Sequence, residues 1–179
     1  MKTLRTPLRL TLILLAVFCG SFYFFYKRAQ SKLPNKPLIQ TSAVIDRPLP
    51  KTNLVSLSGR TLEDAELRQG RVVLVFMMPD CKPCDQENEF LKTIAGSRED
   101  VRFVCVVPFG RKEPVLKIAQ DKYTLEPFYD EVMTVSRELQ MYEVPVKLFL
   151  EDGVIKRTWL GSADDDRKRA AFRTWLNSL

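Results

Sequence analysis

At 179 residues, the chain is long enough for one domain of ordinary size and an appendage, and its 45% hydrophobic and 28% charged residues exclude intrinsic disorder. The net charge is +6, but the basic residues are scattered and form no stripe with interleaved aromatic side chains, so nucleic-acid binding is not expected. The chain has no histidine, which excludes histidine-ligated metal sites, catalytic triads and Cys–His dyads.

The N-terminus has the pattern of a membrane anchor. Residues 1–9 form a basic flank, residues 10–26 carry no charge, and Lys27 and Arg28 follow them. Seventeen residues in a helix rise about 25 Å, slightly less than a typical hydrocarbon core of about 30 Å. The aromatic residues at 22–26 would lie at a membrane interface, and the flanking cations can snorkel to it. We therefore expect a single-pass transmembrane helix over residues 10–26.

Two other interpretations of this segment are a cleaved signal peptide and a lipoprotein site at Cys19. Small residues at a cleavage site are lacking, and Phe18 fits poorly before a lipidated cysteine, so an uncleaved anchor is favoured. Basic residues lie on both sides of the span, so charge alone does not set its orientation. The polar, proline-containing residues 27–45 indicate a semi-extended tether to a domain over residues 46–179.

The pattern within residues 46–179 alternates between short apolar runs typical of strands and segments with helical periodicity. Turn residues separate two pairs of strand-like runs, so each pair predicts a hairpin. The expected elements are a hairpin over 54–62, strands over 71–78 and 101–107, a helix from Lys82 to Gly96, a helix after Pro114, a helical stretch over 135–142, a hairpin over 146–159 and a final helix from Ser162. This order argues for an α/β sandwich.

Cys81 and Cys84 form a Cys-Lys-Pro-Cys motif between the buried strand over 71–78 and the helix that follows. Cys81 would lie at the helix N-terminus, where unpaired backbone N–H groups stabilise a thiolate, the reactive form of cysteine. A Cys-x-x-Cys motif alone also matches zinc knuckles, but structural zinc needs four ligands, and no second cysteine pair has that spacing. The position of the motif therefore predicts a redox-active dithiol.

Glu87 is expected to share a helix face with Cys84, because helical spacing also brings Leu91 and Ile94 to that face. A carboxyl group near buried thiols should have a raised pKa, and it could take the Cys84 proton. The alternative is an ordinary solvated helix residue. Cys105 lies in another apolar run and is expected to be a small buried residue.

Together, these motifs resemble the membrane-anchored thioredoxin-like proteins of the TlpA, ResA and CcmG type. The resemblance covers Arg47 to Leu179, and a glutamate three residues after the second cysteine is a fairly specific mark of this branch. The segments that carry it are Leu57–Arg60, Arg71–Glu87, Tyr142–Pro145 and Glu151–Gly161. The resemblance implies an α/β thioredoxin fold, with a central mixed sheet flanked by helices and an N-terminal β-hairpin extension. It also implies thiol–disulfide exchange in the periplasm or its equivalent, and a cis Pro145 beside the dithiol.

Two departures from this family concern the surface that touches a partner. The family usually has an aromatic residue, often Trp, shortly before the first cysteine, where this chain has Met77-Met78-Pro79-Asp80. Before its cis-proline the family commonly has Gly-Thr or similar, where this chain has Glu143-Val144. A similar Pro-x-Cys-x-x-Cys arrangement occurs in accessory thioredoxin-like proteins for amine dehydrogenase maturation, which is a second interpretation within the same fold.

The resulting prediction is a thiol–disulfide oxidoreductase that uses no cofactor and no metal. Cys81 would form a mixed disulfide with a protein partner, and Cys84 would resolve it. The expected substrate-binding residues are Lys82, Pro83, Val144 and Pro145. The partners would be protein thiols or disulfides and a redox protein that donates or accepts electrons. Since an oxidising compartment supplies such substrates, we expect the domain to face the periplasm or another extracytoplasmic space.

The alternative is a non-catalytic thioredoxin-fold binding module, or a Cu(I) chaperone that uses the same two thiols, because soft thiolates select Cu(I). Copper-delivery relatives of this fold normally add a histidine, which this chain lacks. The direction of electron flow stays open, because it depends on how far the reduced form is stabilised. Lys82 favours the Cys81 thiolate, while Asp80 opposes it.

Overall fold

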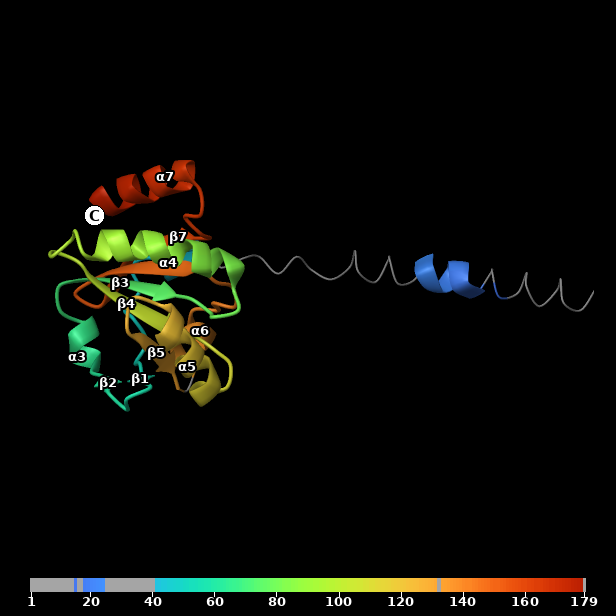
Figure 1. Cartoon of the computed structure of the whole chain (residues 1–179), viewed down its shortest axis with the longest axis horizontal. Helices are drawn as coiled ribbons and strands as arrows, with labels where there is room; N and C mark the ends of the chain where they lie inside the picture. Colours follow the sequence, from blue (N-terminus) through green and yellow to red (C-terminus); the bar gives the residue numbers. More distant parts are fainter. Residues whose placement is uncertain (1–14, 16–17, 25–40, 132, 179) are drawn as a thin grey trace, which may run out of the picture. The chain divides into compact units, whose positions relative to one another are not determined.

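The computed structural model describes residues 15, 18–24, 41–131 and 133–178 (Figure 1). The chain divides into two compact units, residues 1–38 and residues 39–179, which are treated separately. The second unit holds a seven-stranded sheet in the order β2-β1-β5-β4-β3-β6-β7. The strands are β1 Leu54–Ser56, β2 Thr61–Leu62, β3 Arg71–Phe76, β4 Arg102–Val107, β5 Pro127–Asp130, β6 Val146–Glu151 and β7 Val154–Leu160. Only β3, β4 and β5 pair in parallel among these strands, so the sheet is mixed, as expected.

Helices cover both faces of this sheet. They are α2 Thr41–Val44, α3 Asp64–Leu67, α4 Lys82–Ala95, α5 Lys112–Lys122, α6 Thr134–Glu138 and α7 Asp166–Asn177. Successive residues of a strand point to opposite faces. Val73 and Val75 of β3 accordingly pack in one apolar cluster with α4, α5 and α7. Val72 and Leu74 pack in a second cluster with α2, α3 and α6. Burial on both faces explains the continuous apolar run of β3.

Both predicted hairpins are present. Strands β1 and β2 pair antiparallel, and β1 also pairs with β5, so the N-terminal hairpin extends the sheet. Strands β6 and β7 turn at Asp152 and Gly153, which both have positive φ, at 48° and 77°. That geometry is required by the tight turn whose twist matches the two strands.

Several elements differ from the sequence-based expectation. Helices α2 and α3 were not predicted, and α5 begins at Lys112, whereas the helix was expected after Pro114. Strand β5 was not predicted, because its four residues begin with Pro127 and follow α5 without a turn signal. The helical stretch expected to reach Tyr142 ends at Glu138, and Gln140 then adopts a positive φ of 54°. The final helix begins at Asp166 rather than at Ser162, with Asp165 as its N-cap. Among the residues from Ser162 to Asp165, Ala163 is hydrogen-bonded to Glu87 of α4.

The predictions for the N-terminus fall only partly on described residues. The basic flank over 1–9 and residues 25–40 lie outside the described residues, and so does most of the predicted anchor. Residues 18–24 are helical with exposed aromatic side chains. Among the described residues, none of the helices has both the length and the apolar character needed to cross a bilayer. At the end of the predicted tether, Val44 is 4% exposed and packs in the core, so the folded unit includes it.

Candidate active site

Cys81 and Cys84 are joined by a disulfide at the start of α4, with their Cα atoms 5.2 Å apart. Cys81 is the N-cap residue, and its Sγ accepts a hydrogen bond from the Cys84 backbone N–H at 3.2 Å. Pro83 lies in the first helical turn, where its missing N–H is harmless. Cys81 is partly exposed, whereas Cys84 is completely buried. The two sulfur atoms therefore differ in access to solvent.

The loop before the dithiol is braced by the end of α5. The Lys122 ammonium lies 2.7 Å from the Asp85 carboxylate and donates to the Pro79 carbonyl at 2.5 Å. The buried Asn88 side chain donates to the Lys122 carbonyl at 3.1 Å and accepts the Thr124 N–H at 3.2 Å. These contacts fix the first two turns of α4 relative to α5. Sequence reasoning missed them, since the partners are more than thirty positions apart.

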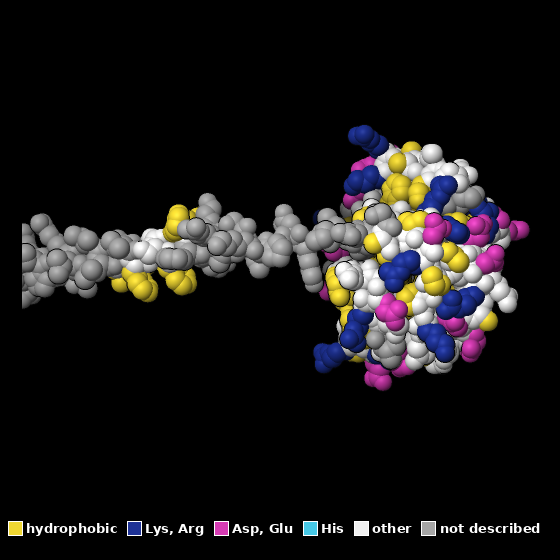
Figure 2. All heavy atoms as spheres, turned by 180° about the vertical axis from the view of Figure 1, so that it is seen from behind, with side chains coloured by type: hydrophobic (Ala, Val, Ile, Leu, Met, Phe, Trp, Pro, Cys, Tyr) yellow, Lys and Arg dark blue, Asp and Glu magenta, His cyan; other side chains and the backbone are white. Residues whose placement is uncertain are grey.

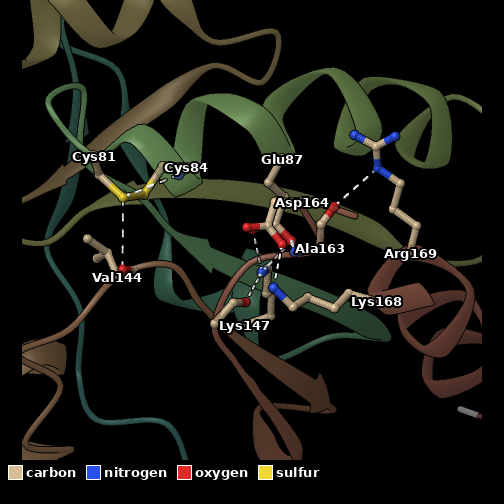
Figure 3. A network of polar contacts seen from close by, with 10 residues as sticks. Cys81, Cys84, Glu87, Val144, Lys147, Ala163, Asp164, Lys168 and Arg169 are labelled. Carbon is tan, nitrogen blue, oxygen red and sulfur yellow. Dashed lines mark hydrogen bonds and ion pairs between the residues drawn. A yellow bond between two sulfur atoms is a disulfide. The ribbon is translucent and has the colours of Figure 1, made fainter. Parts of the chain in front are cut away.

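The segment before β6 brings a backbone carbonyl to the dithiol. The Val144–Pro145 peptide bond is cis, as the family resemblance implies. The Val144 carbonyl oxygen lies 3.9 Å from the Cys81 Sγ (Figure 3). Lys82 and Pro83 are exposed beside Cys81, and Val144 is partly exposed. Lys82, Pro83 and Val144 therefore come together around the accessible sulfur, whereas Pro145, the fourth predicted substrate-binding residue, is buried behind Val144.

Glu87 lies on the buried face of α4 and is paired with a lysine that the sequence analysis did not single out. Its side chain is 0% exposed, and so is the side chain of Lys147 on β6. The Lys147 Nζ lies 2.5 Å from the Glu87 carboxylate and donates to the Gly161 carbonyl at 2.8 Å. Figure 3 shows the carboxylate and the ammonium pointing toward each other beneath α4. The alternative interpretation of Glu87 as an ordinary solvated helix residue is therefore wrong.

Glu87 also holds the chain between β7 and α7. Its Oε1 accepts the Ala163 backbone N–H at 3.1 Å. The Ala163 carbonyl in turn accepts from the Arg169 guanidinium at 3.2 Å. The bond from Glu87 holds Ala163 beside α4, and α7 begins three residues later, at Asp166 and not at Ser162.

Burial dominates the electrostatics of this pair. Burial raises the pKa of Glu87, and the Lys147 cation and the Ala163 N–H oppose that rise. Burial lowers the pKa of Lys147, and the Glu87 charge opposes that change. The direction for Glu87 agrees with the sequence-based expectation. The signal for Lys147 was present in the sequence, as a single cation within an otherwise apolar strand.

The remaining cysteine of the domain lies on the central strand of the sheet. Cys105 is 0% exposed on β4, and burial raises its pKa to about 12. It packs in the apolar cluster beneath α4, as predicted for a small buried residue. Within the described part of the chain, no group of three or more acidic or cysteine side chains is placed to hold a metal ion.

Comparisons with known proteins agree with this geometry. A protein family described as a thioredoxin-like domain matches residues 59–174. Among curated proteins, no sequence matches. The solved structures that are similar include a secreted Mycobacterium tuberculosis disulfide oxidoreductase homologous to E. coli DsbE, with 17% identity, a TM-score of 0.60, and coverage of 73% of this chain and 97% of that chain.

Two further solved structures are similar. The thioredoxin domain of a thiol-disulfide oxidoreductase from Bacteroides vulgatus has 17% identity and a TM-score of 0.59, covering 73% of this chain and 96% of that chain. StoA from Bacillus subtilis has 17% identity and a TM-score of 0.56, covering 73% of this chain and 99% of that chain. At these identities the likeness shows a shared fold.

Proposed function

The chain belongs to the family of thioredoxin-like domains, and from this premise we propose that it is a thiol–disulfide oxidoreductase acting on cysteine pairs of extracytoplasmic proteins. The observation that carries the proposal is the accessible Cys81 sulfur at the start of α4, 3.9 Å from the Val144 carbonyl, with the buried Cys84 behind it. In disulfide exchange, the exposed first thiol can form the mixed disulfide with a partner, and the buried second thiol can then resolve it.

In the reducing direction, the Cys81 thiolate attacks a disulfide of the partner, and one partner sulfur leaves as a thiolate. Cys81 is then joined to the partner by a mixed disulfide. Cys84 loses its proton and attacks the Cys81 sulfur, which forms the Cys81–Cys84 disulfide and releases the second partner sulfur. Two electrons pass from the dithiol to the partner. In the oxidising direction the same bonds form and break in reverse order.

Glu87 serves the second step in this mechanism. It lies one helical turn after Cys84, and burial raises the pKa of its carboxyl group toward the range in which it can exchange protons near neutral pH. As a carboxylate, it takes the proton that Cys84 must lose.

The partner surface is formed by Lys82, Pro83 and Val144, and the buried cis Pro145 orients the Val144 carbonyl toward it. The Val144 carbonyl is a hydrogen-bond acceptor beside Cys81, so an extended partner segment can pair with it by a backbone N–H. Lys82 adds a cation at the exposed rim. Backbone pairing with Val144 would place a partner sulfur at Cys81. Because this pairing uses main-chain groups, it depends little on which side chains the partner carries.

We further propose that the protein is a single-pass membrane protein of the TlpA type, with its domain on the extracytoplasmic side. The support is the uncharged segment over 10–26 between basic residues, together with the exposed aromatic side chains of residues 18–24. On the face of the domain drawn in Figure 2, cationic and anionic side chains are interspersed, which suits a soluble domain held beside a membrane.

The function is tested with the two cysteine variants. Cys81→Ser should abolish disulfide exchange with a reduced or oxidised model protein, because no mixed disulfide can form. Cys84→Ser should accumulate mixed disulfides with partners, visible on non-reducing gels, because nothing resolves them. Cu(I) competition titration provides the comparison with the copper-chaperone alternative. Tight Cu(I) binding by a protein that catalyses no exchange would contradict the proposal.

A further inference from the structure

Lys122, the last residue of α5, contacts the chain on both sides of the dithiol motif. Its ammonium donates to the Pro79 carbonyl at 2.5 Å and lies 2.7 Å from the Asp85 carboxylate. Pro79 lies two positions before Cys81, and Asp85 directly follows Cys84. A single cation from another helix therefore bridges the residues that come just before and just after the two sulfur atoms.

Asp85 belongs to the same helical turn as the two cysteines. Its backbone N–H donates to the Cys81 carbonyl at 3.1 Å, and the Cys84 N–H donates to the Cys81 Sγ at 3.2 Å. The positive potential of a helix N-terminus stabilises an anion placed there. On reduction, the Asp85 carboxylate and a Cys81 thiolate would be two anions at one helix end, and each like charge disfavours the other.

The ion pair between Lys122 and Asp85 is held in place and partly covered. The buried Asn88 side chain donates to the Lys122 carbonyl at 3.1 Å, which fixes the end of α5 against α4. The two charged side chains are 36% and 35% exposed. Within the described part of the chain, the neighbouring Asp80 and Lys82 form no ion pair. Asp85 is thus the acid beside the motif whose charge has a fixed counterion.

We propose that Lys122 is a positioning residue of the dithiol: its ammonium offsets the Asp85 charge at the start of α4 and thereby stabilises the thiolate that Cys81 forms on reduction. This inference rests on the proposed function and adds to it a residue outside the Cys-x-x-Cys motif. Lys122 would act through Asp85 and set how readily the Cys81–Cys84 disulfide is reduced.

The consequence appears in the equilibrium with glutathione. Two glutathione molecules are joined as glutathione disulfide, and their two electrons break the bond between the Cys81 and Cys84 sulfur atoms. The Cys84 sulfur takes up one proton, and where Cys81 stays a thiolate the other proton goes to water. Because the thiolate belongs to the reduced product, a cation that stabilises it moves the equilibrium toward the dithiol.

The test uses the full-length protein in detergent, with Cys19→Ser to remove an exposed thiol. The protein is equilibrated with glutathione buffers at about pH 7 and then alkylated, and mass spectrometry gives the fractions of dithiol and disulfide. Lys122→Met should move the equilibrium constant about 3- to 10-fold toward the disulfide, as expected for a unit charge at a partly exposed site. Tenfold corresponds to about 30 mV. Asp85→Asn should move it by a similar factor toward the dithiol.

The opposite signs separate this role from a structural one, because both substitutions break the same ion pair. A pair that only braced the loop would give shifts in the same direction, and that result overturns the inference. The double variant, in which both charges are removed, should lie close to the starting protein. Lys117→Met removes an exposed cation from the middle of α5 and should leave the equilibrium unchanged. An unchanged equilibrium in folded Lys122→Met, or an equal shift in Lys117→Met, also overturns the inference.

Two further outcomes are distinguishable from these. If glutathione at no ratio reduces the Cys81–Cys84 disulfide of the starting protein, the dithiol is not redox-active and the proposed function itself fails. If circular dichroism shows that Lys122→Met does not fold, Asp85→Asn decides alone. A shift of Asp85→Asn toward the dithiol supports the inference, and no shift or a shift toward the disulfide overturns it.

Discussion

Cys81 and Cys84 differ in environment although both belong to the same short motif. Cys81 caps α4 and is partly exposed, whereas Cys84 is buried at the centre of the cluster beneath the helix. Cys105 is buried in β4, and burial raises its pKa to about 12. Since thiolates are the reactive form, access and pKa together rank the three sulfur atoms.

This ranking predicts the order of alkylation in the reduced protein. With Cys19→Ser present, iodoacetamide should modify Cys81 first, Cys84 much more slowly, and Cys105 only after unfolding in denaturant. Burial raises the pKa of the Cys105 thiol to about 12. Cys105 should therefore stay unmodified at about pH 9 as well as at about pH 7, although a free thiol of ordinary pKa ionises at about pH 9. Peptide mass spectrometry at timed intervals gives the order. Rapid labelling of Cys84 ahead of Cys81 would reverse the assigned roles.

At the scale of elements, the turn between β6 and β7 requires glycine at position 153 for two reasons, its backbone conformation and the lack of space for a side chain. Gly153 has a φ of 77°, and a Cβ added there would lie 2.8 Å from the Cγ of Arg68 and 3.1 Å from its Cα. Gly153 also accepts the Leu49 backbone N–H at 2.7 Å through its carbonyl, so the chain before β1 packs against this turn. Gly59, in the N-terminal hairpin, has a φ of 83° but open space around it.

The two glycines therefore make a matched pair of substitutions. Gly59→Ala should reduce the free energy of unfolding by roughly 1–2 kcal/mol, the cost of a left-handed conformation for an L-residue. Gly153→Ala should cost about 1–3 kcal/mol more, because the methyl group also displaces Arg68. Urea unfolding followed by circular dichroism measures both values. Equal losses would show that Arg68 moves aside freely.

The same elements show what sequence patterns can and cannot supply. Continuous apolar runs predict β3 and β4, and turn residues between apolar runs predict the two hairpins. The spacing of Cys84, Glu87, Leu91 and Ile94 predicts α4 with its end at Gly96. Local signals suffice there, because each segment is long or has a clear turn. The short strand β5 depends on pairing with β4 and β1, which no local pattern reveals.

The start of α7 and the pairing of Lys147 with Glu87 were missed for a related reason. Both depend on Glu87, which reaches 76 positions along the chain to Ala163 and 60 positions to Lys147. A sequence can show that a lysine interrupts an apolar strand, but only the folded chain shows which carboxylate lies opposite. Motif spacing and the family resemblance indicate which positions matter, and they identified the cysteines, Glu87 and Pro145 from the sequence.

At the scale of the whole molecule, we expect the two units of the chain to have separable roles. Residues 39–179 hold the sheet, both apolar clusters and the dithiol, so this unit contains the complete candidate site. The first unit supplies the uncharged segment over 10–26. We therefore expect the first unit to determine where the protein resides and the second to determine what it reacts with.

Fractionation of cells that express the full chain tests this division. The protein should remain in the membrane fraction after high-salt and alkaline washing, and protease added on the extracytoplasmic side should digest the domain. Leu14→Lys combined with Phe18→Lys should release it, since each lysine near the centre of a spanning helix costs about 3 kcal/mol. Two lysines placed instead at Ser31 and Gln40, outside the uncharged segment, should change nothing. A soluble product with a new N-terminus between about residues 20 and 30, where a signal peptide of ordinary length would end, would show cleavage and contradict the anchor.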